Sequence, residues 1–446
     1  MPSDQPPSLL VLSNGHGEDG IALRLIEALQ QRRPGLDVAV LPLVGTGEAY
    51  ATAERSGLLR RVGPRRPLPS GGFSNQSLGG LLQDLAAGLP LLSWQQARLV
   101  RAWGRRGLPM LAVGDLLPLL LAWAGGGPYG FIGTPKSDYT WASPPPPGWG
   151  RSPLADAYHR CKGSEWDPWE WALMRGRRCR LVAVRDRLTA RGLRRRGVAA
   201  EAPGNPMMDG LACPPLPEAL QGRRRLILLA GSRLPEALTN LRRLLQALAS
   251  SSSVPRDGGA GEPGPAGLTL LLATGSRPSP AELAGPLQEA GFQPMSDQQA
   301  ELRRAAAGGA PPAALWRRGP TELWVGPGRF SPWAGWAELG LATAGTATEQ
   351  LVGLGIAALS LPGRGPQFQA GFARRQSRLL GGAVLPCGSP EALREALETL
   401  WQDADTRQRR GRIGRQRMGG AGGSARLAAL IDQRLLARGA GAPPPF

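Results

Sequence analysis

The first 45 residues run as a strand, a glycine-rich turn, an amphipathic helix and a second strand, and this order constrains the fold more than any other feature. Residues 8–13 (SLLVLS) and 37–45 (DVAVLPLVG) are apolar runs typical of buried strands. Between them, residues 21–35 carry apolar side chains at helical spacing and end at Pro34 and Gly35. Strand, helix and strand in this order indicate a parallel sheet covered by helices. The sequence therefore predicts an α/β fold.

The same order starts again halfway along the chain. Residues 226–231 (LILLAG) predict a strand, and residues 238–249 predict a helix after a short loop. A chain of 446 residues is too long for one hydrophobic core, because single cores stop growing near about 250–300 residues. The Pro-rich stretch 202–225 reads as the connection. We expect two Rossmann-like domains, over residues 1–205 and 222–423, which face a central cleft, and a last helix over residues 424–438.

The chain is basic, with 53 Lys and Arg against 34 Asp and Glu and a formal net charge of +19. Lysine occurs only at positions 136 and 162, so the excess is arginine. Codon bias in a GC-rich genome is one source of such an excess, and attraction to phosphates, anionic lipid or nucleic acid is another. The arginines lack interleaved aromatic side chains and an RNA-binding motif, so we expect no nucleic-acid partner.

Cysteine spacing and apolar runs exclude several classes of protein. The four cysteines share no metal-binding spacing, so we expect no metal site. The N-terminus lacks the charged and apolar regions of a signal peptide, which favours a reducing cytoplasm. The longest uncharged stretch, residues 116–135, is interrupted by prolines and glycines, so we expect no membrane span. Residues 143–174 are Pro- and Trp-rich and predict an irregular excursion over the surface.

Two turns of the second half can offer backbone N–H groups to an anion. Gly231, Ser232 and Arg233 follow a predicted strand and precede a helix, where the helix dipole and the guanidinium suit phosphate oxygens. The segment 343–355 (TAGTATEQLVGLG) repeats this arrangement. Its small residues allow a ligand to approach the backbone, its threonines can donate to phosphate or cap the helix, and one acid or amide can accept from ribose hydroxyls. The residues concerned are Gly345, Thr346, Ala347, Thr348, and Glu349 or Gln350. The plainer alternatives are an ordinary loop and a capped helix.

Three glutamines, Gln367, Gln369 and Gln376, surround a loop rich in glycine and arginine at residues 362–376. Their uncharged amides suit sugar hydroxyls. A solvated loop is the alternative.

The first predicted turn holds candidates for acid–base chemistry. It reads Gly15, His16, Gly17, Glu18 and Asp19, and His16 is one of only two histidines. An imidazole beside carboxylates can act as a general base or orient an acceptor, and the two glycines would let a substrate approach. A structural loop is the alternative. Asp115, after the apolar run MLAVG, is a second base candidate or the N-cap of the next helix.

Together these motifs resemble lipid-A-disaccharide synthase and, more closely, the lipid-A-disaccharide-synthase-related proteins. The motifs are GSRLPEA, ATAGTATEQ, LPGRGPQFQ with FARRQ, and GNPMMD. They also resemble the peptidoglycan lipid-linked N-acetylglucosaminyltransferase, whose His-containing glycine loop is similar to NGHGED. The resemblance implies a GT-B fold, no required metal or other cofactor, and inverting transfer of a sugar from a UDP-sugar, possibly of the UDP-GlcNAc type, to a lipid-linked acceptor.

The resemblance also implies roles for single residues. Ser232 and Arg233 would hold the diphosphate, with Gly345, Thr346 and Ala347 facing it, and Glu349 or Gln350 would meet the ribose. Gln369 matches the glutamine of a sugar-binding pattern in which Phe372 replaces an asparagine. Residues 1–205 would bind the acceptor, residues 222–423 the donor, and the helix 424–438 would pack back on the first domain.

We therefore expect a UDP-sugar-dependent hexosyltransferase that acts on a lipid or lipid-linked acceptor. His16, Asp115 and Glu18 are the catalytic candidates. Residues 79–103 have an apolar face able to touch lipid, or form an ordinary buried helix pair, which fits a cytoplasmic protein held at the inner face of a membrane. The alternatives are a UDP-sugar 2-epimerase, which needs no lipid, and a non-catalytic nucleotide-sugar binding protein.

Overall fold

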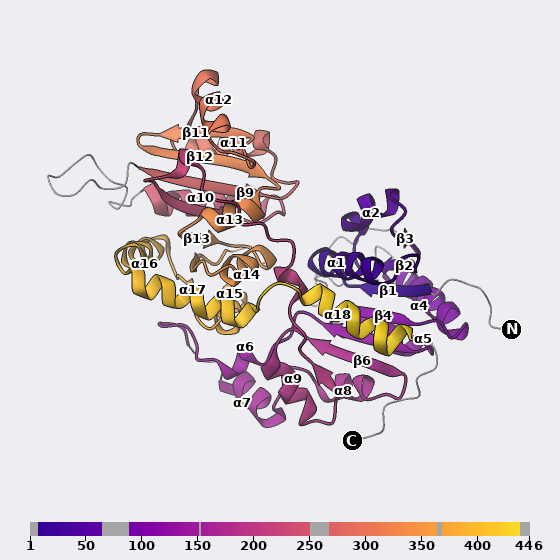
Figure 1. Cartoon of the computed structure of the whole chain (residues 1–446). Helices are drawn as coiled ribbons and strands as arrows, with labels where there is room; N and C mark the ends of the chain where they lie inside the picture. Colours follow the sequence, from indigo (N-terminus) through magenta and orange to yellow (C-terminus); the bar gives the residue numbers. More distant parts are fainter. Residues whose placement is uncertain (1–7, 65–88, 151–152, 250–266, 364–367, 438–446) are drawn as a thin grey trace. The chain divides into compact units, whose positions relative to one another are not determined.

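The computed structural model describes residues 8–64, 89–150, 153–249, 267–363 and 368–437, which form two compact units (Figure 1). Of these residues, unit 1 contains 8–138, 153–209 and 420–437, and unit 2 contains 139–150 and 210–419. The chain therefore passes from one unit to the other four times.

Unit 1 is built on a seven-stranded parallel sheet in the order β3-β2-β1-β4-β5-β6-β7. The strands are β1 (Ser8–Ser13), β2 (Asp37–Pro42), β3 (Arg60–Arg61), β4 (Met110–Gly114), β5 (Tyr129–Gly133), β6 (Cys179–Val184) and β7 (Ala200–Glu201). Strands β1, β4 and β5 are buried almost throughout, which explains why they read as continuous apolar runs in the sequence.

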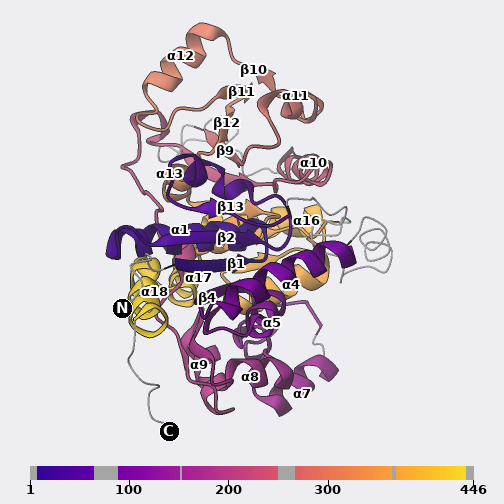
Figure 2. The same cartoon turned by 90° about the vertical axis from the view of Figure 1, so that its right-hand side faces the viewer.

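Helices cover this sheet. They are α1 (His16–Arg32), α2 (Ala51–Arg55), α4 (Leu89–Arg105), α5 (Leu116–Gly125), α7 (Pro153–Lys162), α8 (Pro168–Met174), α9 (Arg187–Arg194) and α18 (Gly423–Ile431), with short turns η1 (Glu48–Tyr50), η3 (Pro206–Met208) and η5 (Asp432–Leu436). Helix α4 packs against α5 (Figure 2), and α18 packs against α1 (Figure 1). The last described helix of the chain thus belongs to unit 1.

Unit 2 repeats the same plan with an addition at one edge. Its strand order is β10-β11-β12-β9-β8-β13-β14-β15, and every pair is parallel except β10 with β11 and β11 with β12. The strands are β8 (Arg224–Leu229), β9 (Leu268–Thr274), β10 (Gln293–Pro294), β11 (Ala314–Arg318), β12 (Thr321–Pro327), β13 (Leu339–Ala342), β14 (Ala358–Ser360) and β15 (Val384–Pro386).

The helices of unit 2 are α6 (Tyr139–Ala142), α10 (Glu236–Ala249), α11 (Pro280–Glu289), α12 (Asp297–Ala305), α13 (Phe330–Trp336), α14 (Thr346–Gly353), α15 (Ala370–Leu379), α16 (Pro390–Gln402) and α17 (Ala404–Met418), with the turn η4 (Glu218–Leu220). Leucines from the sheet, α10 and α16 form an extended apolar cluster in its core. The prediction of two Rossmann-like α/β domains is confirmed.

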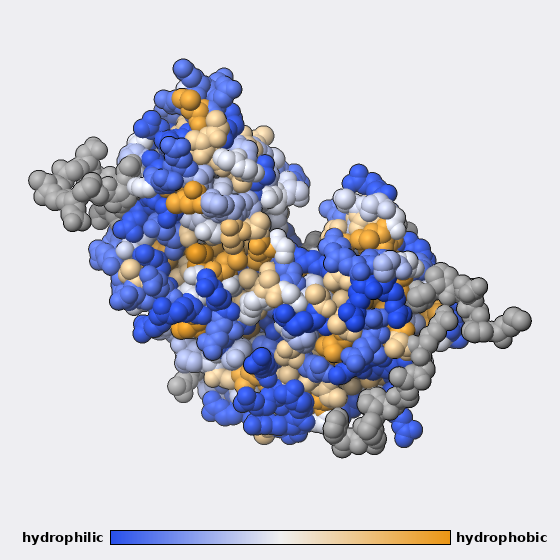
Figure 3. All heavy atoms as spheres, in the orientation of Figure 1, coloured by the Kyte–Doolittle hydropathy of each residue, from blue (hydrophilic) through white to orange (hydrophobic). Residues whose placement is uncertain are grey.

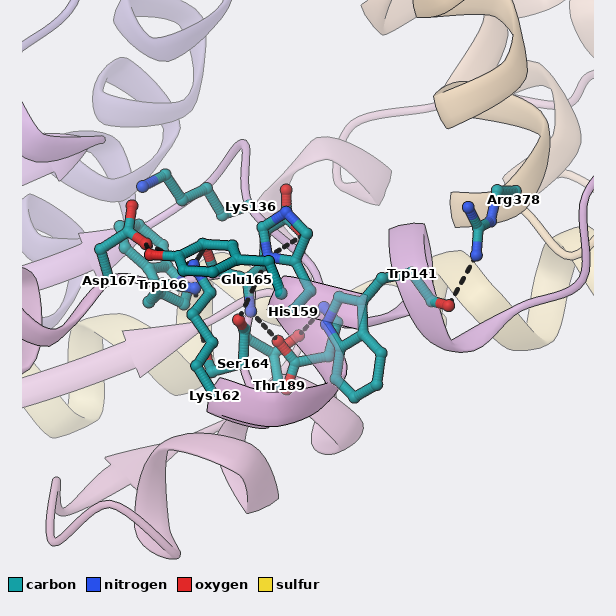
Figure 4. A network of polar contacts seen from close by, with 12 residues as sticks. Lys136, Trp141, His159, Lys162, Ser164, Glu165, Trp166, Asp167, Thr189 and Arg378 are labelled. Carbon is teal, nitrogen blue, oxygen red and sulfur yellow. Dashed lines mark hydrogen bonds and ion pairs between the residues drawn. The ribbon is translucent and has the colours of Figure 1, made fainter. Parts of the chain in front are cut away.

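Residues 139–150 are grouped with unit 2 because arginine and tryptophan side chains hold their backbone there. The buried Arg378 of α15 donates to the carbonyl oxygens of Ser143, at 2.9 Å, and Trp141, at 2.6 Å (Figure 4). Trp149 Nε1 in turn donates to Pro386 O at 3.0 Å. Helix α6 packs against α15.

The motif GNPMMD forms the junction from which α18 starts. Both carboxylate oxygens of Asp209 accept from backbone N–H groups at the start of that helix, Oδ1 from Gly422 and Gly423 and Oδ2 from Ser424. Burial alone would raise the pKa of Asp209, but these hydrogen bonds together hold it below the ordinary value. Asp209 therefore caps a helix that is distant in sequence.

The prediction of an irregular excursion over residues 143–174 is wrong. It contains helices α7 and α8, and α8 begins with a capping box in which Asp167 N donates to Glu170 Oε2 at 2.7 Å. Trp166 and Trp171 are buried in the core of unit 1, while Trp169 is exposed. The high Pro and Trp content of this segment is therefore compatible with regular helices, and Pro168 stands in the first turn of α8.

Candidate functional site

Each unit has one place where the strand order reverses, and the predicted residues of unit 1 follow the two strands that flank it. Strand β1 lies between β2 and β4, so the turns that leave β1 and β4 are neighbours. Asn14 follows β1 and Asp115 follows β4, and Asn14 Nδ2 donates to Asp115 Oδ1 at 2.9 Å. Open parallel sheets bind ligands at such points.

The glycine turn after β1 requires its first glycine. Gly15 has φ +94°, and a Cβ there would lie 2.9 Å from Val44 O, so any other residue would be strained. Helix α1 begins at His16, whose side chain lies outside the described part of the structure, and Gly17 is in its first turn. The backbone of this predicted turn is thus defined, and the role of the imidazole stays a prediction.

Two carboxylates of the first turn of α1 are largely withdrawn from solvent. The pKa of Glu18 is raised to about 7, chiefly by burial and in part by the nearby Asp115 and Asp19, while its hydrogen bonds act against the rise. Thr134, after β5, donates to Glu18 Oε1 at 3.4 Å. Glu18 therefore changes charge close to neutral pH, as a general acid or base must.

Asp19 points into the protein. Its Oδ1 accepts from Ser13 Oγ at 2.6 Å, and Tyr50 OH donates to the same hydroxyl at 2.8 Å. Burial raises the pKa of Asp19 to about 6. This buried chain of hydrogen bonds anchors the turn after β1 rather than presenting Asp19 to a ligand.

Asp115 is the N-cap of α5, because its carboxylate accepts from Leu117 N at 3.2 Å as well as from Asn14. Burial raises its pKa, and the ammonium of Lys136 opposes that rise. The cap and a catalytic role are compatible, since a carboxylate has several acceptor positions.

Lys136 is a residue of this region that sequence reasoning did not select. Its Nζ donates to both carboxylate oxygens of the fully buried Glu170, at 2.7 and 2.6 Å. The same Nζ lies 4.8 Å from the centre of the Trp166 ring, and Figure 4 labels both Lys136 and Trp166. The sequence offers one signal for a role of Lys136. It is one of only two lysines in the chain, and it lies three residues after the end of strand β5.

In unit 2, the strand order reverses between β8 and β13, and the two predicted turns follow those strands. Gly231 has φ +99° after β8, Ser232 is exposed, and Arg233 is half-buried, which lowers the pKa of its guanidinium. After β13, Gly345 precedes α14, whose first residue Thr346 is exposed. The sheet therefore brings the two predicted turns to neighbouring positions.

The remaining predicted residues of unit 2 differ in accessibility. Thr348 Oγ1 donates to Ala344 O at 2.7 Å, so this hydroxyl is used within its own helix. Gln350 is buried, whereas Glu349 and Ala347 are partly exposed. Gln369 is exposed at the start of α15, and Gln367 lies outside the described residues. Gln376 is buried behind the turn after β13 and does not face solvent.

Within the described ranges, no group of three His, Cys, Asp or Glu side chains is arranged to hold a metal ion. In the same ranges, no helix has the length and apolar character that crossing a bilayer requires.

The raised pKa of Glu18 predicts a pH-dependent stability. Its folded value of about 7 exceeds the ordinary 4.5, so the stabilisation by the proton is complete below pH 4.5 and is lost as pH rises through 7. Glu18→Gln, which stays neutral, should therefore gain roughly 1 to 3 kcal/mol over the wild type between pH 4.5 and 8. Urea unfolding at both pH values measures this, with the exposed Glu27→Gln on the same helix as control. An equal effect of both variants would contradict the burial of Glu18.

Comparison with known proteins gives the fold by structure alone. No protein-family model matches the chain, and no curated protein matches it in sequence. Among solved structures, the S. aureus MnaA–UDP co-structure aligns over 96% of this chain and 96% of its own, with a TM-score of 0.55 and 13% identity. The calicheamicin glycosyltransferase CalG4 aligns over 97% and 98%, with a TM-score of 0.54 and 17% identity.

A protein assigned as a UDP-N-acetylglucosamine 2-epimerase from Listeria monocytogenes aligns over 96% of this chain and 97% of its own, with a TM-score of 0.51 and 12% identity. Identities this low speak for the architecture and not for the reaction. Two Rossmann-like units and alignment over nearly the whole length of these proteins show that the chain has the GT-B fold.

Proposed function

We propose that the protein is an inverting glycosyltransferase that moves a sugar from a UDP-sugar to a lipid or lipid-linked acceptor. The observation that carries this proposal is the pair of turns in unit 2, at Gly231–Arg233 and Gly345–Ala347, which the sheet makes neighbours at its reversal point. The fold is shared with a protein solved with UDP. Residues 222–423 would form the donor domain and residues 1–205 the acceptor domain, with the helix at 424–438 on the latter.

The donor is held by its diphosphate. Helix α14 begins directly after Gly345, and α10 begins at Glu236, three residues after Arg233. The dipoles of both helices favour an anion at their N-terminal ends, and Arg233 adds a charged fork. Ser232 and Thr346 can donate hydroxyl groups. Glu349 suits the ribose better than Gln350, because Gln350 is buried. Gln369, and Gln367 beyond the described residues, would contact the sugar.

Unit 1 supplies the base. An acceptor hydroxyl loses its proton to the base, its oxygen forms a bond to the anomeric carbon of the sugar, and the bond from that carbon to the β-phosphate oxygen breaks to release UDP. Glu18, with a pKa of about 7, can accept this proton near neutral pH. His16 and Asp115 are the other candidates, in and beside the turn that contains Gly15 and Gly17.

A surface for the membrane completes this proposal. The exposed apolar side chains Leu91 and Trp94 of α4 and Leu117, Leu120 and Trp123 of α5 form what we call the α4–α5 surface. On the face of the molecule drawn in Figure 3, hydrophobic residues lie scattered among hydrophilic ones. Arg98 stacks on Trp94 at 5.5 Å, and Trp with Arg suits an anionic lipid interface. The protein would act at the inner, cytoplasmic face of a membrane. Residues 79–88 of the predicted lipid-contacting segment lie outside the described residues.

A UDP-sugar 2-epimerase is the second candidate, favoured by the structural similarity to the Listeria monocytogenes protein. A non-catalytic nucleotide-sugar binding protein is the third. The three differ in what they need: a transferase needs an acceptor, an epimerase needs only the UDP-sugar, and a binding protein turns over neither.

UDP, and not ADP, should raise the melting temperature of the protein. Arg233→Ala should weaken UDP binding about 10- to 100-fold, because it removes a charge-assisted hydrogen bond to phosphate. Calorimetric titration measures the affinity, and the exposed Arg304→Ala on α12 of the same unit is the control. Absence of any shift with UDP in the wild type would remove the donor site.

UDP release from a UDP-sugar should depend on added lipid acceptor. Glu18→Gln should slow it about 10²- to 10⁴-fold at unchanged UDP affinity, as expected for loss of a general base. A coupled assay for UDP with a panel of UDP-sugars and bacterial lipid extracts tests this. Interconversion of the sugar without lipid would instead establish the epimerase, and no turnover of any donor would favour the binding protein.

The α4–α5 surface predicts binding to anionic vesicles. Replacing Trp94 and Trp123 together by Ser should lower binding to phosphatidylglycerol vesicles at least about tenfold, because each large apolar side chain contributes roughly 1.5–3 kcal/mol on burial. Sedimentation with vesicles measures it, and Leu302→Ser, an exposed apolar residue on α12, is the control. Equal binding by both variants would show that lipid is contacted elsewhere.

A further inference from the structure

Gln376 is a buried amide in unit 2 whose hydrogen bonds point to the second anion-binding turn. It lies on α15 with 3% of its surface exposed. Its Nε2 donates to the carbonyl oxygens of Ala344, at 3.3 Å, and Gly345, at 3.2 Å, immediately before α14. The sequence suggested a contact with sugar hydroxyls for this glutamine, but its polar atoms reach the backbone of the turn after β13.

The orientation of this amide is fixed. Turning it over would place Oε1 against two carbonyl oxygens, so the nitrogen must face the turn. Oε1 is consequently buried, with no hydrogen-bond partner in the described part of the chain. A buried unsatisfied oxygen costs free energy that an apolar side chain of the same size would avoid. The stability of unit 2 alone does not explain a glutamine here.

What the contact does follows from the geometry of the peptide bond. In a planar trans peptide, the C=O and the N–H point in opposite directions. The carbonyl of Ala344 shares its peptide with the N–H of Gly345, and the carbonyl of Gly345 shares its peptide with the N–H of Thr346. When Gln376 binds both carbonyls from one side, both N–H groups are directed to the other side.

The turn itself is not crowded by side chains at Gly345. A Cβ placed on Gly345 would find its nearest neighbour, the Phe372 ring, at 3.8 Å. The two N–H groups have no partner among the described residues, as expected at the start of a helix. Two adjacent amides and a helix N-terminus make an anion site.

We propose that Gln376 is a positioning residue that holds the turn 344–346 so that the amides of Gly345 and Thr346 receive the diphosphate of the donor. This inference rests on the proposed function, because it assumes UDP at this turn. Gln376 itself does not touch the nucleotide. It raises the affinity for the phosphates by orienting the backbone of the turn. The contacts that the protein makes with the base and the ribose of the nucleotide do not depend on it.

The test compares UDP with uridine, which lacks the phosphates. Gln376→Met keeps the volume and removes the donor. The fold should tolerate it, because Ala344 O still accepts from Thr348 Oγ1 and Gly345 O from Glu349 N. Calorimetric titration should show UDP affinity lowered about tenfold and uridine affinity unchanged. Gln376→Glu, which places carboxylate oxygens against the carbonyls, should lower UDP affinity further.

The matched control is Gln96→Met in unit 1. Gln96 is equally buried and donates to a backbone carbonyl, Leu43 O, at 3.0 Å, and both residues belong to unit 1. It should lose similar thermal stability and keep both affinities. Unchanged UDP affinity in Gln376→Met, or an equal loss for UDP and uridine, would overturn the positioning role alone. A wild type that does not bind UDP would overturn the proposed donor site and this inference with it.

Discussion

The reversal of strand order is the constraint on which both candidate sites depend. In unit 1, β1 lies between β2 and β4, and in unit 2, β8 lies between β9 and β13. The turns that leave β1 and β4 are therefore neighbours, and so are the turns that leave β8 and β13. Right-handed crossovers then place the following helices on opposite faces of the sheet. The turns after these strands therefore share one edge of each sheet, at residues 14–19 and 115 in unit 1 and at residues 231–233 and 345–347 in unit 2.

The two units use the same position for opposite electrostatics. In unit 1, Glu18, Asp19 and Asp115 are withdrawn from water, and each pKa is raised by burial, so this edge can exchange protons near neutral pH. In unit 2, the edge carries small residues, Arg233, and the N–H groups of Gly345 and Thr346, which have no partner among the described residues. Such an edge suits a fixed negative charge. The proposed sugar transfer from a nucleotide requires both a proton acceptor and an anion site.

Sequence patterns sufficed where a local rule governs the outcome. The glycine turns follow buried strands and precede helices, as their apolar runs and periodicity predicted, and Asp115 takes the N-cap position considered for it. Asp167, Pro168 and Glu170 form a capping pattern that indicates the start of α8. The Pro and Trp content of residues 143–174 nevertheless led to the prediction of an irregular segment, without α7 and α8. The sequence thus contained local signals for the glycine turns and for the start of α8.

By itself, the sequence determined the two α/β units and the turns that can carry chemistry, because strand burial, helix periodicity and glycine conformation are properties of short segments. Only the tertiary structure decided which side chains meet across those segments. Lys136 with Glu170, Asp209 with the start of α18, and Gln376 with the turn before α14 join residues 34, about 215 and about 31 positions apart. No spacing rule covers such pairs, since the packing of helices on a sheet sets them and not the chain between them.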